Sequence, residues 1–285
     1  MKTPKRLLPL QEEGMIDEVL SQLMSGKEAI VYVVRCGDQI RCAKVYKDAS
    51  QRSFKQAAAY QEGRTVKNSR QARAMQKGTK YGRKMQEEVW HNAEVDALYK
   101  CAAAGVRVPI PHICFEGVLL MDLVSTEDGA VAPRLNDVAL SHAQALVYHE
   151  ELIYQVVLML CAGIVHGDLS EFNILLNEQG PVIIDLPQAI NAAGNIGAAS
   201  MLERDVNNLR SYFSQFAPEL AHTQYGKEIW KLFAAGLLTP ETVLTGKVAQ
   251  DKRPVNVRAV VEEIELARQE AEERQRYLES RQPEY

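Results

Sequence analysis

The first half of the chain alternates between short β-branched runs and one long helical stripe. Residues 30–34 and 39–46 are strand-like and flank a Gly-Asp pair, which predicts a β-hairpin. Residues 112–116 and 118–124 predict two more strands joined at a glycine. Apolar residues at helical spacing predict a helix over 85–104. Together these runs predict a small mixed sheet with one helix packed on it.

The second half of the chain is predicted to be mostly helical. Apolar residues at helical spacing predict a helix over 145–160 that ends near Gly163, and further helices over 202–213 and 227–235. Residues 257–281 alternate Glu and Arg, with opposite charges at i,i+4, and predict a long charged helix. This last helix fits either a solvated extension or a partner-binding arm.

Size and charge add an expectation about partners. At 285 residues the chain exceeds the commonest domain size, so two lobes or domains are expected. Its net charge of −4 argues against a protein that binds nucleic acid over its whole surface. Residues 51–90 nevertheless hold ten Lys/Arg against three Asp/Glu, and residues 47–84 show little apolar periodicity. We expect a basic insertion at 47–84, which is either solvated or a contact surface for an anionic partner.

Cysteine usage and hydropathy bear on the compartment. The five cysteines form no C-x-x-C pair, and their odd number cannot close a full set of disulfides, which favours a reducing compartment. The longest nearly apolar run, residues 152–165, is shorter than the ~20 residues that span a bilayer. We therefore expect a cytoplasmic protein with no membrane partner.

The residues that carry chemistry gather between His166 and Asp185. Asp168 and Asn173 are spaced D-x-x-x-x-N, and Asp185 follows the apolar run 182–184. Asp168 could orient or deprotonate a hydroxyl, while Asn173 and Asp185 offer the oxygen ligands that Mg²⁺ prefers. A phosphoryl-transfer site needs this combination of an aligned acceptor and a held metal.

Two further features would bind the phosphate donor. Lys44 interrupts a strand-like run, and Glu94 on the predicted helix is its expected inward partner. Small and polar residues before the first strand could let backbone N–H groups approach phosphates. These residues are Ser25, Gly26, Lys27, Glu28 and Ala29. Each feature alone is also compatible with a turn, a cap or a solvated side chain, but their order and spacing together favour phosphoryl transfer.

This order is that of protein kinases, and the residues resemble the RIO family of atypical serine/threonine protein kinases, in its bacterial type. The resemblance covers about residues 15–225. It is carried by S-G-K-E-A-x-V-Y (25–32), A-K-V-Y (43–46), W-x-x-x-E (90–94), V-P-x-P (108–111), L-L-M-D-L-V (119–124), H-G-D-L-S-E-F-N-I-L-L (166–176) and I-I-D-x-x-Q (183–188).

The resemblance implies an α+β, bilobal, protein-kinase-like fold with a small N-lobe sheet, one N-lobe helix, a mostly helical C-lobe and no activation segment. The expected divisions are a polar lead-in (1–14), an N-lobe (15–124, with the basic insertion at 47–84), a C-lobe (125–240) and an extension ending in the charged helix (241–285).

The resemblance also implies how ATP would be bound. Residues 25–29 would cover the phosphates, and Lys44 would hold the α- and β-phosphates while paired to Glu94. Asp168 would be the catalytic base, with Asn173 and Asp185 as ligands of Mg²⁺, or alternatively Mn²⁺. The adenine contacts would come from Val31, Ala43, the gatekeeper Met121, and backbone groups of Asp122 and Val124.

Three departures matter, one from the RIO family and two from ordinary kinases. Ile30 stands where the family's loop often carries Asn. Ser170 stands where ordinary Ser/Thr kinases have a lysine, so the cation that meets the γ-phosphate must come from elsewhere or be missing. Residues 186–188 read Leu-Pro-Gln rather than beginning Phe-Gly, with no Ala-Pro-Glu after them, so the usual peptide platform is not expected.

Two functions therefore remain open, with a weaker third. The first is transfer of the γ-phosphate of ATP to Ser or Thr of an unknown protein substrate or of the chain itself. The second is an ATPase switch that assembles ribosomal or other RNA–protein particles through residues 51–90, with phosphorylation of Asp185 as one way in which it could act. A small-molecule kinase would share the Asp168–Asn173 spacing but would not explain S-G-K-E-A.

Overall fold

The computed structural model describes residues 2–26, 29–47 and 93–248. The chain divides into two compact units, Met1–Lys247 and Val248–Tyr285, and nearly all described residues belong to the first. The basic insertion and the helix predicted over 257–281 lie outside the described residues.

Five antiparallel strands form the N-terminal sheet. They are β1 (Glu18–Ser25), β2 (Ala29–Cys36), β3 (Gln39–Tyr46), β4 (Pro111–Phe115) and β5 (Val118–Asp122), in the spatial order β1-β2-β3-β5-β4. The predicted hairpin joins β2 to β3 and turns at Gly37, whose φ of 59° suits glycine. The sequence did not predict β1 because most of its side chains are exposed, so no apolar run marks it.

The N-terminal residues pack on one face of this sheet. A 3-10 turn, η1 (Lys5–Leu7), leads into α1 (Leu8–Glu12), and Leu7 and Leu10 are fully buried in a cluster that includes Val34 of β2. Expecting residues 1–14 to be a polar lead-in was therefore wrong. Two leucines at helical spacing suffice to bury one face of a segment that is otherwise polar.

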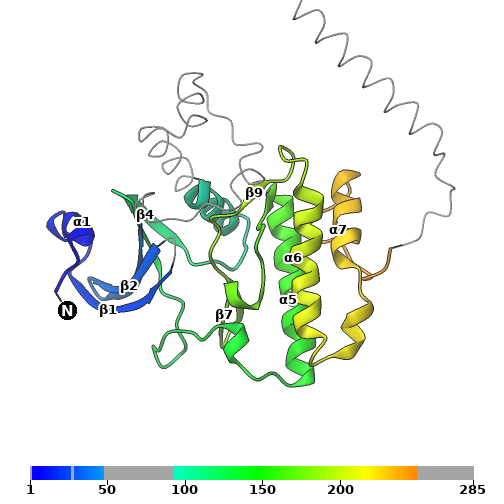
Figure 1. The fold of residues 1–285 in the computed structure, drawn as a ribbon, viewed down its shortest axis with the longest axis horizontal. Helices are drawn as coiled ribbons and strands as arrows, with labels where there is room; N and C mark the ends of the chain where they lie inside the picture. The colour runs from blue at the N-terminus through cyan, green and yellow to red at the C-terminus, as the bar shows by residue number, and fades with distance from the viewer. Residues whose placement is uncertain (1, 27–28, 48–92, 249–285) are drawn as a thin grey trace, which may run out of the picture. The chain divides into compact units, whose positions relative to one another are not determined.

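Three helices dominate the C-terminal half. Figure 1 shows α5 (His142–Cys161), α6 (Ala198–Phe213) and α7 (Tyr225–Ala234) packed beside one another. The bounds agree with the helices expected at 145–160, 202–213 and 227–235. Ser141 starts α5 with a capping box in which Gln144 is the reciprocal partner. None of the described helices is long and apolar enough to cross a membrane.

Short elements connect the sheet to these helices. Residues 93–103 are helical, which agrees with the described part of the helix expected at 85–104. The other short elements are η3 (Leu135–Asp137), β6 (Ile164–Val165), η4 (Glu171–Asn173), β7 (Ile174–Asn177), β8 (Gly180–Ile183), β9 (Ile190–Asn191) and η5 (Pro218–His222). β6 pairs with β9 and β7 pairs with β8, so the chain between His166 and Asp185 is fixed at both ends.

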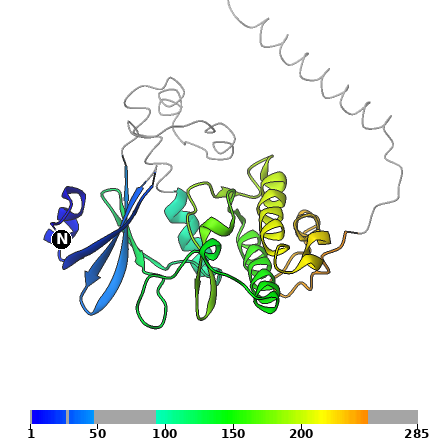
Figure 2. The same cartoon turned by 60° about the horizontal axis from the view of Figure 1, so that its bottom comes forward.

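One hydrophobic core joins the sheet to the helices. Its buried members include Leu119 of β5, Leu98 of the segment 93–103 and Leu152 of α5. The sheet and the helical part are seen from a second direction in Figure 2. The same compact unit continues past the expected boundary at residue 240, because Glu228 of α7 accepts hydrogen bonds from the backbone N–H groups of Thr245 and Gly246.

Candidate active site

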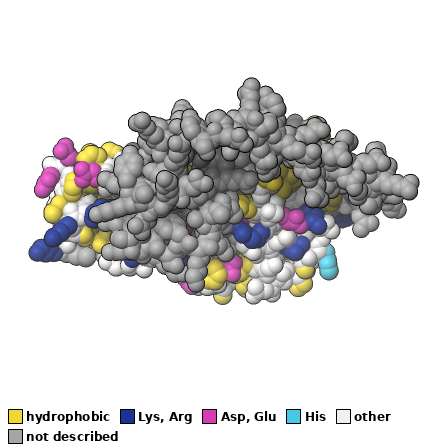
Figure 3. All heavy atoms as spheres, turned by 45° about the horizontal axis from the view of Figure 1, so that its top comes forward, with side chains coloured by type: hydrophobic (Ala, Val, Ile, Leu, Met, Phe, Trp, Pro, Cys, Tyr) yellow, Lys and Arg dark blue, Asp and Glu magenta, His cyan; other side chains and the backbone are white. Residues whose placement is uncertain are grey.

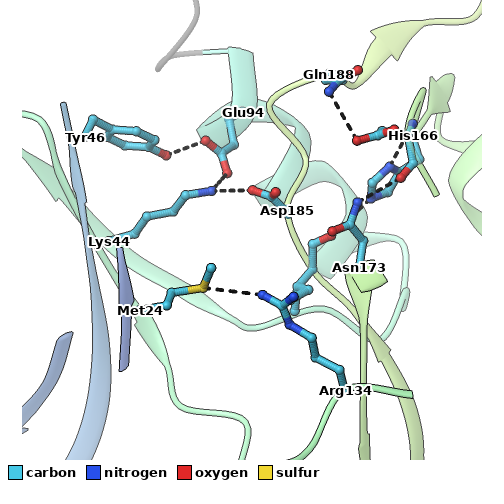
Figure 4. Close-up of polar contacts among 11 residues, drawn as sticks. Met24, Lys44, Tyr46, Glu94, Arg134, His166, Asn173, Asp185 and Gln188 are labelled. Atoms are coloured by element: carbon cyan, nitrogen blue, oxygen red, sulfur yellow. Dashed lines mark hydrogen bonds and ion pairs between the residues drawn. The ribbon is translucent and has the colours of Figure 1, made fainter. Parts of the chain in front are cut away.

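Lys44 lies at the centre of a buried polar cluster. Its ammonium is 2.5 Å from Glu94 Oε1 and 2.7 Å from Asp185 Oδ1, and the residue is only 8% exposed. The hydroxyl of Tyr46 donates to Glu94 Oε2 at 2.7 Å. Figure 4 shows these side chains converging from β3, from the helix that carries Glu94 and from the chain that follows β8. The predicted Lys44–Glu94 pair is therefore confirmed.

Charge and burial oppose one another in this cluster. Burial alone would lower the pKa of Lys44, but the carboxylates of Glu94 and Asp185 more than offset it, so that pKa lies well above its usual value. Lys44 in turn is the main cause of the lowered pKa of Asp185. Burial, reinforced by Glu94, raises the pKa of Tyr46 well above its ordinary value, so Tyr46 remains a donor.

His166 fixes the start of the catalytic loop, residues 166–173. Its Nε2 lies 3.1 Å from the carbonyl oxygen of Ile184, so Nε2 carries the proton and donates it. Its Nδ1 then accepts the backbone N–H of Asp168 at 3.3 Å. Burial lowers the pKa of His166, in keeping with a neutral ring that acts as a scaffold.

Asp205 of α6 holds the backbone of the same loop. Its two carboxylate oxygens accept the backbone N–H groups of Gly167 at 2.7 Å and Leu169 at 3.1 Å, and Arg204 donates to the carbonyl of Gly167. Burial raises the pKa of Asp205 to about 7, although the two N–H groups and Arg204 act in the opposite direction. Arg204 and Asp205 together therefore brace the backbone at the start of the catalytic loop.

The loop presents Asp168 and Asn173 on one side. Asn173 Nδ2 donates to the backbone carbonyl of Asp168 at 2.8 Å, which orients its side-chain oxygen away from the loop. Gln188 Nε2 donates to Asp168 Oδ2 at 3.2 Å. Loss of hydration raises the pKa of Asp168, and the nearby charge of Asp185 adds to this while Arg204 opposes it. A raised pKa makes Asp168 a better proton acceptor.

Asp185 is suited to bind a metal ion. It adopts a left-handed backbone conformation with φ of 66°, uncommon for a residue other than glycine, and its side chain is 47% exposed. No group of three or more His, Cys, Asp or Glu side chains that could hold a metal occurs among the described residues. One carboxylate with the Asn173 carboxamide fits Mg²⁺, which keeps water and phosphate oxygens as its other ligands.

The loop expected over the phosphates joins β1 to β2. Gly26 N–H donates to the carbonyl of Ala29 at 2.9 Å, and Lys47 Nζ donates to the carbonyl of Gly26 at 2.7 Å. Ser25 ends β1 and also contacts Lys47, at 3.2 Å. Lys27 and Glu28 lie outside the described residues.

Strand alternation corrects one of the expected adenine contacts. Val31 pairs directly with Lys44 and shares its face of the sheet, and Met121 packs against the core on that face. Ala43, one residue from Lys44, points to the opposite face of the sheet. It is fully buried there in the cluster that also contains Leu10 of α1. Assigning Ala43 to the adenine was therefore wrong. Cys42, two residues before Lys44 and paired with Met121, is the residue that shares the face of Lys44.

Asp122 ends β5 and Val124 follows it, just after Met121, the expected gatekeeper. The backbone N–H of Asp122 donates to Ile110, and the carbonyl of Val124 accepts from Ala132. Because these two groups already have partners within the protein, we expect the Asp122 carbonyl and the Val124 N–H to be the backbone groups that contact adenine.

Three side chains at the site were not assigned from the sequence. Tyr46 carries a usable signal, since it lies two residues from Lys44 on a strand and must share its face. Gln188 belongs to the I-I-D-x-x-Q motif, but its partner could not be inferred. Arg134, whose guanidinium lies 3.6 Å from Met24 Sδ in Figure 4, follows a proline in a connection and carries no signal.

The sequence model of the RIO domain matches residues 30–225, more than half of the chain, including Lys44, Asp168, Asn173 and Asp185. The chain belongs to the RIO family. The chain is 33% identical over 207 residues to the RIO-type serine/threonine-protein kinase Rio1 of Haloferax volcanii, an alignment that covers 72% of this chain and 66% of that protein.

More distant relatives of this RIO domain include eukaryotic proteins. The human serine/threonine-protein kinase RIO1 is 30% identical over 214 residues, covering 74% of this chain and 36% of that protein. The granulovirus kinase PK-1 of Cydia pomonella, a solved structure, aligns with a TM-score of 0.41 and 16% identity over 66% of this chain and 58% of that one.

Proposed function

We propose that this RIO-family chain transfers the γ-phosphate of ATP to a Ser or Thr hydroxyl, on a protein substrate or on itself. The observation that carries the proposal is the ion-pair cluster in which Lys44 bonds both Glu94 and Asp185. Residues far apart in sequence meet there, beside a loop that presents Asp168 and Asn173. Curated relatives named as serine/threonine-protein kinases support the same reading.

Each residue has a role in the proposed reaction. Asp168 accepts the proton of the acceptor hydroxyl while the hydroxyl oxygen forms a bond to the γ-phosphorus and the bond to the β-phosphate oxygen breaks, which releases ADP. Gln188 holds one oxygen of Asp168, which leaves the other directed to the acceptor. Lys44 binds the α- and β-phosphates, with its position fixed by Glu94.

Asn173 and Asp185 would hold the divalent cation, for which Mg²⁺ is the proposed ion and Mn²⁺ an alternative. The ion would neutralise charge on the β- and γ-phosphates. In the structure, Asp185 Oδ1 is bonded to Lys44, so Asp185 is positioned beside the phosphate-binding lysine.

Replacing the base tests this assignment. Asp168→Asn is expected to reduce phosphoryl transfer by about 10²-fold or more, because the acceptor proton loses its receiver, while Mg·ATP affinity stays within about twofold. Transfer is measured with labelled ATP and affinity by calorimetry. Asp96→Asn, on the exposed side of the helix at 93–103, is the matched control. Undiminished transfer by Asp168→Asn would remove Asp168 from the mechanism.

The destination of the phosphate separates a kinase from an ATPase switch. We propose protein phosphorylation as the main outcome, with action on an RNA–protein particle through residues 51–90 as the second candidate. On the face shown in Figure 3, Lys/Arg and Asp/Glu side chains of described residues are interspersed. Support for an anionic partner thus rests on the composition of 51–90. Label found on purified partner proteins favours the kinase, whereas free phosphate with salt-sensitive co-purification of ribosomal particles favours the switch.

A further inference from the structure

The catalytic loop contributes no cation of its own. Between Asp168 and Asn173 the sequence is Leu-Ser-Glu-Phe, and Ser170 stands where a lysine is usual in Ser/Thr kinases. Lys44 is already shared between two carboxylates. A triphosphate in this site would carry more negative charge than Lys44 and one metal ion balance, and catalysis of phosphoryl transfer depends on such compensation.

Arg134 lies where the missing charge is needed. Its backbone pairs with that of Leu175 in β7, two residues after Asn173, so the backbone of Arg134 lies next to the end of the catalytic loop. Its side chain crosses to the sheet, where Nη2 lies 3.6 Å from Met24 Sδ, immediately before Ser25. Figure 4 shows the guanidinium between Met24 on β1 and the loop that carries Asn173.

Among the described residues, no carboxylate forms a salt bridge with the guanidinium of Arg134. The thioether of Met24 is a weak acceptor for one of its five N–H groups. A partly exposed guanidinium with unused donors is suited to bidentate recognition of a phosphate.

We propose that Arg134 binds the phosphate chain of the nucleotide and supplies, from the connection before η3, the cation that the catalytic loop lacks. This inference rests on the proposed ATP-dependent function. The competing explanation is a strut, in which Arg134 only ties β1 to the helical half through Met24.

Nucleotides of decreasing charge separate these explanations. Binding of Mg·ATP, Mg·ADP and adenosine is measured by calorimetry for the wild type, Arg134→Gln and Arg134→Lys. For Arg134→Gln we expect at least a tenfold loss of ATP affinity, a smaller loss for ADP and none for adenosine; Arg134→Lys recovers part of the ATP affinity because it keeps the charge. Thermal melting confirms that each variant is folded.

Two controls isolate the cation. Arg35→Gln removes the same charge from an exposed arginine of β2 paired to Glu18 and should leave all three affinities unchanged. Met24→Leu removes the thioether contact but keeps the guanidinium, and should also leave ATP affinity unchanged.

Equal losses for ATP and adenosine in Arg134→Gln, or the same loss in Met24→Leu, would show a strut and overturn the proposal. Unchanged ATP affinity in Arg134→Gln would overturn it while leaving the proposed function intact. If the wild type itself fails to bind Mg·ATP, both the proposed function and the role of Arg134 are overturned.

Discussion

The two sides of the candidate site are held together by different kinds of bonds. On the sheet side, Lys44, Glu94, Tyr46 and Asp185 are joined through side chains that are mostly charged. On the helical side, the catalytic loop is held mainly through its backbone, by the carboxylate of Asp205. Removing one member of the sheet-side cluster therefore leaves a buried charge without its partner, which lowers the stability of the fold. Removing Asp205 instead frees the backbone of the catalytic loop, while the side chains of that loop remain intact.

The largest effect is expected on the sheet side, in Lys44→Met. Glu94 would remain buried without its cation, and breaking a buried pair in this way costs about 3–5 kcal/mol of unfolding free energy. Nucleotide affinity should fall as well. Chemical denaturation and calorimetry measure the two effects.

A double variant, Lys44→Met with Glu94→Leu, serves as the control. It removes the unpaired charge, so most of the stability should return while nucleotide affinity stays low. If Lys44→Met alone were as stable as the wild type, the cluster would not behave as a buried ion pair.

A somewhat smaller effect is expected on the helical side, in Asp205→Ala. Two buried backbone N–H groups, of Gly167 and Leu169, would lose their acceptor, at a cost of roughly 3–4 kcal/mol. Phosphoryl transfer should fall because Asp168 lies between these residues, but nucleotide affinity should be nearly unchanged, in contrast with Lys44→Met. Denaturation, transfer assays and calorimetry are compared with the exposed variant Asp96→Ala; parallel loss of affinity and transfer would mean that the two sides are not independent.

The smallest of the three effects depends on pH and comes from the helices beneath the loop. His149 of α5 is buried against the rings of Phe213 and Tyr225, and burial lowers its pKa to about 4. Between pH 6.5 and 4 the unfolded chain binds a proton that the folded chain does not, so stability falls as the pH decreases. The full loss is about 3 kcal/mol.

The matched variant for this prediction is His149→Phe. Its stability should lose less between pH 7 and pH 4.5 than that of the wild type, as measured by denaturant unfolding at each pH. Asp185 should keep its charge over this range, because Lys44 lowers its pKa. Identical pH dependence in both proteins would show that His149 is not the acid-sensitive group.

Much of this arrangement was predictable where the sequence pattern is periodic. The hairpin of β2 and β3, the three large helices and the Lys44–Glu94 pair follow from alternation, helical spacing and motif order. The strand β1 and the helix α1 could not be found in this way, since one is largely exposed and the other is buried through only two leucines. Ala43 was misplaced because a motif was followed without counting alternation from Lys44.

The remaining contacts could not be read from the sequence because they form across long separations. Asp205 reaches back to Gly167 and Leu169, and Arg134 reaches back to Met24. Such contacts depend on how the sheet, the loop and the helices are packed, which no local pattern encodes.

The short connection between Asp185 and α6 has a further consequence. Residues 186–197 contain only the two-residue strand β9 and turns, so this described connection offers no long strand with which a peptide could pair. An extended peptide substrate could therefore not be aligned by pairing with this connection. The acceptor hydroxyl would have to be presented by a surface that is already folded, on a partner or on the chain itself, and discrimination among acceptors would then depend on the shape of that surface rather than on the residues flanking its serine or threonine.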